Sequence, residues 1–568
     1  MRHYYFLCLL LLVMACKKTE DSKVTTSETE TTEITNDETE TTQINNDEND
    51  ISDISTKDFR EFKVLDSKYI TNESIWAEIN DDLSDFTEDD YIALASSIID
   101  QDIPTLHRHI QDGKFNYETL TKFYLYRIRK YDRQNELSLN SVISINPNAI
   151  KEARAKDEKL KNMEVSEDLL YSVYGMPILL KDNINTVDMP TTAGAVALKD
   201  NYTDDAFIVS QLKANDAIIL GKANLSEWAY FFCGDCPSGY SAIGGQTLNP
   251  YGRRIIDTGG SSSGSGVAVA ANFCAAAIGS ETSGSILSPA SQNSTVGLKP
   301  TIGLVSRTGI VPISSTLDTA GPITRNVTDN AIVLDALFGE DKADSKSLMI
   351  LWKPPFYTTG LNEASLQGKR FGVFNNIKSD TLYMNAVEVL KAQGAEIVEL
   401  DPLEIDLPKF IRLLNLDMKP DLAAYLKDYS NADLGYESIE DIMGFNKTDS
   451  LNIMPYGQRL FEGVSNDQAT TEEFDEIKSV LKANGMRFFD EPMKAHNLDG
   501  VLSINNYHAG YAAVAEYPAL TVPMGYTETG APRGLTFISS RLREKQLLEW
   551  AYAYEQASKM RVSPKNYN

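Results

Sequence analysis

The stretch between residues 259 and 289 restricts the fold more than any other part of the chain. It reads GGSSSGSGVAVAANFCAAAIGSETSGSILSP, two clusters of glycine and serine on either side of a small apolar segment. Glycine and serine disfavour regular helices and strands, so each cluster is expected to form a loop whose backbone approaches another group closely. The segment between them, residues 267–278, predicts a buried helix of about three turns.

Composition alone also allows plainer interpretations of this stretch. It could be a packing seam of small residues or a flexible linker, although a linker is not usually interrupted by a buried apolar segment. Residues 260–264, GSSSG, also match the G-x-S-x-G nucleophile elbow, which needs a preceding strand and a histidine base such as His496 or His508. The residues before them carry only a short apolar run, which argues against an elbow.

A serine nucleophile needs a base, and the chain has only five histidines. Lysine can serve if burial lowers its pKa from about 10.4 far enough to leave it neutral. Lys181 follows the apolar residues 176–180 and is predicted to end a buried strand. The alternative is a solvated lysine that caps the strand end.

Lys181 in GMPILLKDNI and the two serine clusters together resemble the amidase signature family. The resemblance implies a catalytic Lys181, a bridging Ser261 on a cis peptide bond and a nucleophile, Ser285. Proton transfer from Ser285 through Ser261 to Lys181 would lead to an acyl-enzyme that water hydrolyses. Backbone N–H groups would form the oxyanion hole; they belong to Thr282, Ser283, Gly284 and Ser285.

The similarity extends roughly from Thr105 to the C-terminus and is weak over residues 341–499. Family members often carry T-D-x-G-G-S-I-R around the nucleophile, whereas this chain has SETSGSIL, with Ser283 for a glycine and Leu287 for the arginine. Leucine cannot bind a carboxylate bidentately. With the serine clusters and the missing arginine, the chain most resembles the peptide amidase branch of the family, which removes C-terminal amides from peptides. A broad aryl or aliphatic amidase is the alternative within the family, and a non-catalytic surface lipoprotein that binds amides or peptides is the alternative outside it.

The N-terminus predicts export. Residues 1–15 contain one arginine and the apolar run YYFLCLLLLVM, typical of a signal peptide. The sequence VMAC resembles a bacterial lipobox, so Cys16 is expected to carry a lipid anchor and to attach the protein to a bacterial membrane, the outer membrane by our expectation. An ordinary secretory signal is the alternative. Residues 16–57 contain the lipidation site and an acidic Thr/Glu-rich tract that we expect to be a disordered spacer.

Charge and cysteine usage limit the partners. A formal net charge of −28 argues against nucleic acid, and no cofactor or metal is expected. Cys233 and Cys236 form an isolated C-x-x-C, which argues against a zinc site and favours a disulfide in an exported protein. Cys274 is expected in the buried helix of residues 267–278 as plain core. The oligomeric state and the membrane face are left open.

The remaining chain divides into a helical extension, residues 58–104, and one amidase domain, residues 105–568. The family resemblance implies an α/β fold with a central mixed sheet covered by helices on both faces. Periodicity supports this where it is readable: residues 120–131 have one apolar helical face, and residues 369–400 follow a strand, helix, strand order.

Overall fold

A computed structural model describes residues 62–162 and 166–567. Their main feature is an eleven-stranded sheet. Its strands are β1 (Val142–Ile145), β2 (Pro177–Lys181), β3 (Ile218–Ala223), β6 (Ala276–Glu281), β7 (Val296–Lys299), β8 (Thr319–Thr324), β9 (Arg370–Phe374), β10 (Glu396–Leu400), β11 (Gly500–Ile504), β12 (Ala519–Tyr526) and β13 (Pro532–Ile538). A two-stranded sheet pairs β4 (Tyr240–Ser241) with β5 (Gly245–Gln246).

The large sheet is mixed, in the order β1-β3-β2-β6-β8-β7-β12-β13-β11-β9-β10. Strand β2 is parallel to both of its neighbours, β3 and β6, whereas β6, β8, β7, β12 and β13 are joined by antiparallel pairings. Every residue of β2, β3, β6, β7, β8 and β11 is buried. Strands buried throughout need cover on both faces.

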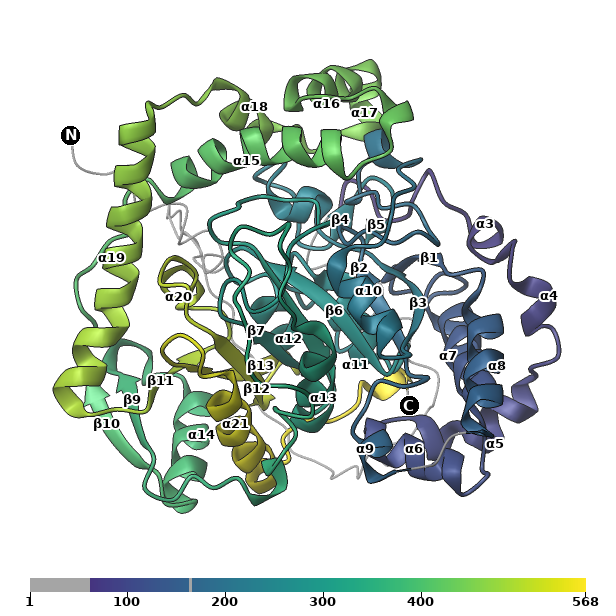
Figure 1. Cartoon of the computed structure of the whole chain (residues 1–568), viewed down its shortest axis with the longest axis horizontal. Helices are drawn as coiled ribbons and strands as arrows, with labels where there is room; N and C mark the ends of the chain where they lie inside the picture. The colour runs from purple at the N-terminus through teal and green to yellow at the C-terminus, as the bar shows by residue number, and fades with distance from the viewer. Residues whose placement is uncertain (1–61, 163–165, 568) are drawn as a thin grey trace, which may run out of the picture. The chain divides into compact units, whose positions relative to one another are not determined.

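Helices supply that cover (Figure 1). The N-terminal helices are α3 (Asn72–Trp76), α4 (Asn80–Leu83), α5 (Glu88–Ile98), α6 (Ile103–Gln111), α7 (Tyr117–Tyr131), α8 (Ala149–Leu160), α9 (Glu167–Leu170) and α10 (Phe207–Ala214). The others are α11 (Ser263–Ala270), α12 (Leu287–Gln292), α13 (Val327–Leu337), α14 (Thr381–Ala392), α15 (Phe410–Asp428), α16 (Ile439–Asn446), α17 (Ser450–Ile453), α18 (Arg459–Asn466), α19 (Thr471–His496), α20 (Ala509–Val514) and α21 (Glu544–Ser558). Helices α12, α14 and α21 all pack on β12, and the predicted α/β architecture is confirmed.

The predicted helix over residues 267–278 is wrong in its extent. Helix α11 begins earlier, at Ser263, and ends at Ala270, where Asn272 takes a left-handed backbone conformation with φ of 57°. From Ala276 the chain forms β6 instead. Alanine is the strongest helix former, but helix propensity is a weak constraint, and pairing with β2 and β8 in the middle of the sheet overrides it. Cys274 is fully buried, as expected, but lies between the two elements.

Other local predictions agree with the structure. The apolar face of residues 120–131 belongs to α7, and the strand, helix, strand order is β9-α14-β10, in which β9 and β10 pair in parallel. Residues 72–98 form α3, α4 and α5, and α6 begins at Ile103, so a boundary after residue 104 falls in the first turn of α6. The division into an extension and a domain stays a prediction.

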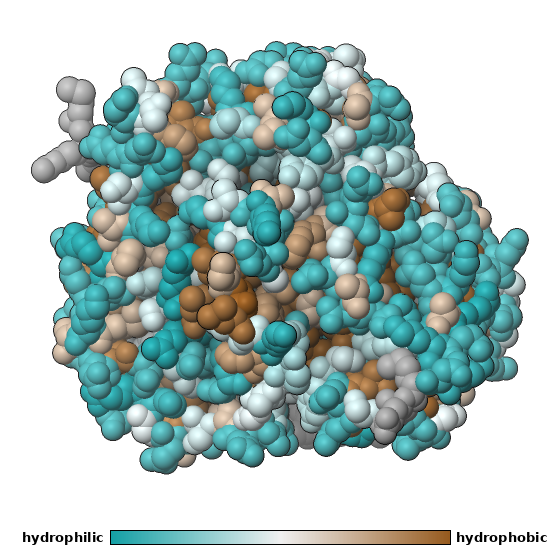
Figure 2. All heavy atoms as spheres, viewed as in Figure 1, coloured by the Kyte–Doolittle hydropathy of each residue, from teal (hydrophilic) through white to brown (hydrophobic). Residues whose placement is uncertain are grey.

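The signal peptide, Cys16 and the spacer of residues 16–57 lie outside the described residues. Among the helices of residues 62–162 and 166–567, none is both long and apolar enough to span a bilayer. Figure 2 shows that one face of the molecule is mainly hydrophilic, with apolar residues gathered near its middle.

Candidate active site

Lys181 is the last residue of β2 and is fully buried. The register between β2 and β6 pairs Leu180 with Ile278, so Lys181 lies beside the end of β6. Its Nζ donates hydrogen bonds to Ser261 Oγ at 2.7 Å, Ser280 Oγ at 2.9 Å and Ser280 O at 3.1 Å. The solvated strand-end lysine is therefore excluded.

No carboxylate forms an ion pair with Lys181 within the described ranges. Burial lowers the pKa of its amino group to about 7, although the charges of Asp318 and Glu281 oppose this shift. At neutral pH a large share of the amine is thus unprotonated and can accept a proton.

Ser261 is fully buried and follows a cis peptide bond with Gly260, as the family resemblance implied. Its carbonyl accepts a hydrogen bond from Ser226 N–H at 3.0 Å. The adjacent Ser262 connects the cluster to β6, because its Oγ donates to Ser280 O at 3.1 Å and accepts from Ser280 N–H at 3.2 Å. The first serine cluster is therefore fixed against the strand that leads to the second.

Ser285 lies in the turn between β6 and α12 and is only partly buried, unlike Lys181 and Ser261. Ser262 N–H donates to Ser285 O at 3.2 Å, which brings the two clusters together. In the part of the chain that the structure describes, no acceptor takes the backbone N–H groups of Ser283, Gly284 or Ser285. Successive free N–H groups beside an accessible hydroxyl suit an oxyanion that forms there.

Two carboxylates that hold this turn, Glu281 and Asp318, were not singled out from the sequence. Glu281 Oε2 accepts from the N–H groups of Ile286 at 2.7 Å and Leu287 at 3.0 Å. Thr282 Oγ1 donates to Asp318 Oδ1 at 2.5 Å, while Asp318 Oδ2 accepts from two backbone N–H groups, those of Ile313 and Ser314. Glu281 directly precedes the predicted oxyanion residue Thr282, which is a usable signal; Asp318 has none.

Leu287 begins α12 and is fully buried in an apolar cluster with Phe374 and Phe488. Its side chain supplies no polar contact to the turn. Position 287 thus supplies no cation to the turn.

A cavity of about 350 Å³ adjoins the end of β6. Ser280 and Thr282 lie on one side, residues 307–315 form another, and residues 421–429 of helix α15 and the loop after it form a third. We call this space the α15 cavity. Since Ser280 contacts Lys181, the cavity adjoins the surroundings of Lys181 and extends toward α15.

The histidine alternative does not fit. His508 is buried and its Nδ1 pairs with Ser503 Oγ at 2.7 Å, and burial lowers the pKa of its ring to about 4. His496 ends the exposed surface of α19, where its carbonyl accepts from Arg370. Residues 249–262 form turns and no strand, so they cannot build a nucleophile elbow.

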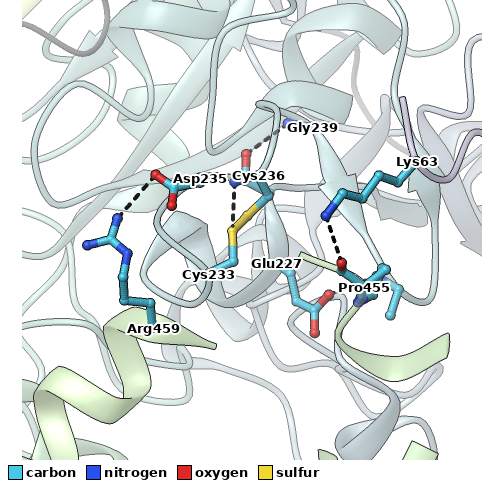
Figure 3. The surroundings of a disulfide bond; sticks show 10 residues. Lys63, Glu227, Cys233, Asp235, Cys236, Gly239, Pro455 and Arg459 are labelled. Atoms are coloured by element: carbon cyan, nitrogen blue, oxygen red, sulfur yellow. Dashed lines mark hydrogen bonds and ion pairs between the residues drawn. A yellow bond between two sulfur atoms is a disulfide. The ribbon is translucent and has the colours of Figure 1, made fainter. Parts of the chain in front are cut away.

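Cys233 and Cys236 are joined by a disulfide in the structure (Figure 3). Both are buried in one apolar cluster with Trp228 and with Phe461 of α18. The same loop bonds α18 through Leu460 N–H and Phe232 O at 2.9 Å. Within residues 62–162 and 166–567, no set of three or more metal-binding side chains comes together. The disulfide and these contacts thus hold the loop against α18. Ala229 of the same loop lines the α15 cavity.

A buried lysine of lowered pKa, a bonded buried serine and an accessible serine beside free N–H groups are the chemistry required of an acyl-transfer hydrolase. Residues 119–548 match the family model described as Amidase. A probable amidase from Arabidopsis thaliana is 34% identical over 83% of this chain and 92% of its own length. The chain therefore belongs to the amidase family and is an amide hydrolase.

Solved structures agree with this assignment. An amidase family protein from Bacillus anthracis has a TM-score of 0.83 and 37% identity, covering 88% of this chain and all of that one. The peptide amidase from Stenotrophomonas maltophilia has a TM-score of 0.76 and 37% identity, covering 82% of this chain and 98% of its own.

Proposed function

We propose that this amidase hydrolyses the C-terminal amide of peptides, using Ser285 as nucleophile and Ser261 and Lys181 as its proton relay. The observation that carries the proposal is the 2.7 Å contact of Ser261 with a buried lysine whose pKa is about 7. A neutral Lys181 accepts the Ser261 proton while Ser261 accepts that of Ser285.

The chemical steps balance without a cofactor. Ser285 Oγ attacks the amide carbon, and the resulting oxyanion is stabilised by backbone N–H groups of the turn, those of Thr282, Ser283, Gly284 and Ser285. The C–N bond breaks as the relay returns a proton to the nitrogen, so ammonia leaves and an ester remains on Ser285. Water, deprotonated by the same relay, then releases the peptide acid and restores the serine.

The similarity to a solved peptide amidase supports the choice of substrate. The buried, apolar Leu287 supports it as well, because a site for a carboxylate-bearing amide would need a cation there. A C-terminally amidated peptide has no carboxylate at its reacting end.

Mass spectrometry of an amidated peptide tests the proposal, with Ser285→Ala protein as the control. Hydrolysis raises the peptide mass by about one unit, as an amide becomes an acid, and only the unchanged protein should produce this gain. If neither protein changes the peptide but small aryl or aliphatic amides are hydrolysed, the broad amidase alternative replaces it. If the variant is as active as the unchanged protein, Ser285 is not the nucleophile.

We also propose that the protein is exported and anchored to a bacterial membrane through lipid on Cys16. The signal-like residues 1–15 and the lipobox-like VMAC support this. Radiolabelled palmitate should be incorporated when the full chain is expressed in a bacterium, and Cys16→Ala should abolish incorporation. Equal labelling of both proteins would contradict the anchor.

A further inference from the structure

The lining of the α15 cavity contains four carboxylates and one cationic side chain. Its charged lining residues are Arg307, Asp318, Asp344, Asp421 and Asp428. Arg307 is already engaged, because its Nε donates to Asp344 Oδ2 at 2.9 Å and its terminal nitrogens bond Asp344 and Ser315 O. Among the described residues that line the cavity, Arg307 is therefore the only cation, and it is already paired with Asp344.

The four carboxylates differ in how many hydrogen bonds and ion pairs they already form with the protein. Asp318 uses both oxygens, on Thr282, Ile313 and Ser314, and Asp344 uses both on Arg307. Asp421 accepts hydrogen bonds from Ser315 alone among the described residues, with the Ser315 N–H at 2.6 Å from Oδ2. Asp428 faces only the exposed Lys427, at 3.8 Å. Acceptor capacity remains on Asp421 and Asp428.

Asn183 gives a second, independent indication that a ligand with a hydrogen-bond donor binds in the α15 cavity. Asn183 lines the cavity, and its side chain is only 2% exposed. Its Nδ2 donates to Ser280 Oγ at 2.9 Å and to Val311 O at 3.3 Å, but its Oδ1 accepts no hydrogen bond from the part of the chain described. A buried carbonyl oxygen left unbonded costs free energy, which a ligand N–H would recover.

We infer that the α15 cavity is a subsite for a cationic group of the substrate, an ammonium or a guanidinium, and that Asp421 determines this specificity. The inference rests on the proposed function. The cavity volume suits a side chain, and α15 is held in place independently of Asp421. Tyr425 of α15 donates to Asn185 Oδ1 at 2.8 Å and accepts from Asn201 Nδ2 at 3.0 Å.

The raised pKa of Asp421 fits a carboxylate that no cation of the protein bonds directly. Burial first, and then the charges of Asp417 and Asp318, raise the pKa of Asp421 to about 7, while hydrogen bonds from Ser315 lower it. A bound ammonium would offset this repulsion and favour the ionised carboxylate. The charge of Arg307 also acts on Asp421, but Arg307 is already paired with Asp344.

Two substrates of nearly equal size separate charge from shape: acetyl-lysinamide and acetyl-norleucinamide. We expect the lysyl amide to have a kcat/KM at least tenfold higher in the unchanged protein, mainly through KM. Asp421→Asn should reduce this ratio by about tenfold while leaving the norleucinamide rate within about twofold. Asp433→Asn, an exposed carboxylate outside the cavity, should leave the ratio unchanged.

The cation could come from a side chain or from a free N-terminus. Glycyl-norleucinamide against its acetylated form distinguishes these sources, because only the first carries an N-terminal ammonium. A ratio near one for the lysyl pair and for this pair, or the same ratios in Asp421→Asn, would overturn the subsite.

The subsite and the proposed function can fail separately. If acetyl-norleucinamide is hydrolysed as efficiently as acetyl-lysinamide, the subsite is contradicted but the proposed reaction is not. If neither amide is hydrolysed, calorimetric binding of acetyl-lysinamide and acetyl-norleucinamide to the Ser285→Ala protein still tests the subsite. Tighter binding of acetyl-lysinamide, lost in the Ser285→Ala/Asp421→Asn protein, would support it, and equal binding would overturn it.

Discussion

At the scale of single residues, burial rather than ion pairing controls the charge of Lys181. Its partners are hydroxyl and carbonyl oxygens, and the nearest carboxylate charges only partly oppose the loss of solvation. Each unit of pKa lowering corresponds to about 1.4 kcal/mol. The fold thus maintains an amine that is neutral enough to act as a base.

This arrangement predicts the pH dependence of the reaction. Because the pKa of Lys181 is lowered to about 7 and the base is its unprotonated form, kcat/KM should rise about tenfold per pH unit below 7 and level off above it. Lys181→Arg, which stays protonated, should lose at least about a thousandfold. A profile that is flat between pH 5 and pH 9 would contradict Lys181 as the base.

Gly284 predicts a second residue-scale effect. Its φ of +89° favours glycine, and an added Cβ would lie 2.9 Å from Asn506 Nδ2. Gly284→Ala should destabilise the protein by about 1–3 kcal/mol and lower kcat, because the oxyanion N–H groups would shift. Gly368→Ala is a matched control with φ of +72° and open space around it. Equal kcat in the two variants would argue against a role for this turn in the reaction.

At the scale of elements, the closeness of α11 to its neighbours depends on glycine. A Cβ on Gly264 would meet Ser141 O and lie 2.5 Å from the backbone of Asn224. Ser265 Oγ in the same helix donates to Ile278 O of β6 at 3.2 Å. Helix and strand therefore pack through backbone and small side chains, which explains the composition of the whole stretch.

Alanine at two helical glycines tests this packing by thermal or urea unfolding. Gly264→Ala should destabilise the protein by about 3 kcal/mol or more, since backbone must move to admit the methyl group. Gly444→Ala in α16 meets nothing within 4 Å and should stabilise by about 0.5–1 kcal/mol. Similar effects at both positions would show that α11 is packed less closely than described.

The Cys233–Cys236 disulfide closes a very short loop, with a sequence separation of 3. Loop-closure entropy then predicts a modest contribution of about 2 kcal/mol to the free energy of unfolding. Cys233→Ala/Cys236→Ala protein should be less stable by about that amount and should keep most of its kcat. Intact mass should rise by two hydrogens on reduction of the unchanged protein; no rise would mean that the thiols are free.

At the scale of the whole molecule, the C-terminal residues fasten the first helices to the sheet. Arg127 of α7 is fully buried and donates to Ala271 O at 2.8 Å, to Tyr91 OH and to Tyr567 O. Tyr567 is also fully buried, and its hydroxyl donates to Leu137 O at 2.6 Å. Residues separated by most of the chain therefore share one core.

Truncation of that aromatic side chain tests the link. Tyr567→Ala should lower the free energy of unfolding by about 3–5 kcal/mol, since a large buried ring is lost. Val562→Ala, at a side chain 62% exposed in the same segment, should change it by less than about 0.5 kcal/mol. A small effect of Tyr567→Ala in a denaturant titration would mean that the C-terminus is not part of the cooperative core.

The sequence by itself determined what depends on residue type and local spacing. The apolar run before Lys181, the face of α7 and the β9-α14-β10 order follow from periodicity. Both serine clusters were expected to form loops; residues 259–262 and 282–286 do, whereas residues 263–266 begin helix α11. It misjudged residues 267–278, because the preference of alanine for a helix is weaker than the pairing of β6 with β2 and β8.

Only the tertiary structure decided what depends on distant partners. Lys181 meets Ser261 and Ser280 because β2 and β6 are parallel neighbours, and no local pattern encodes that pairing. The lowered pKa of Lys181 comes from burial by the whole fold. Asp421 reaches the cavity from α15, in the region where the family resemblance is weakest. The residue types that carry the chemistry can thus be recognised in the local sequence. Their proximity, the burial that lowers the pKa of Lys181 and the substrate pocket depend on the folded chain.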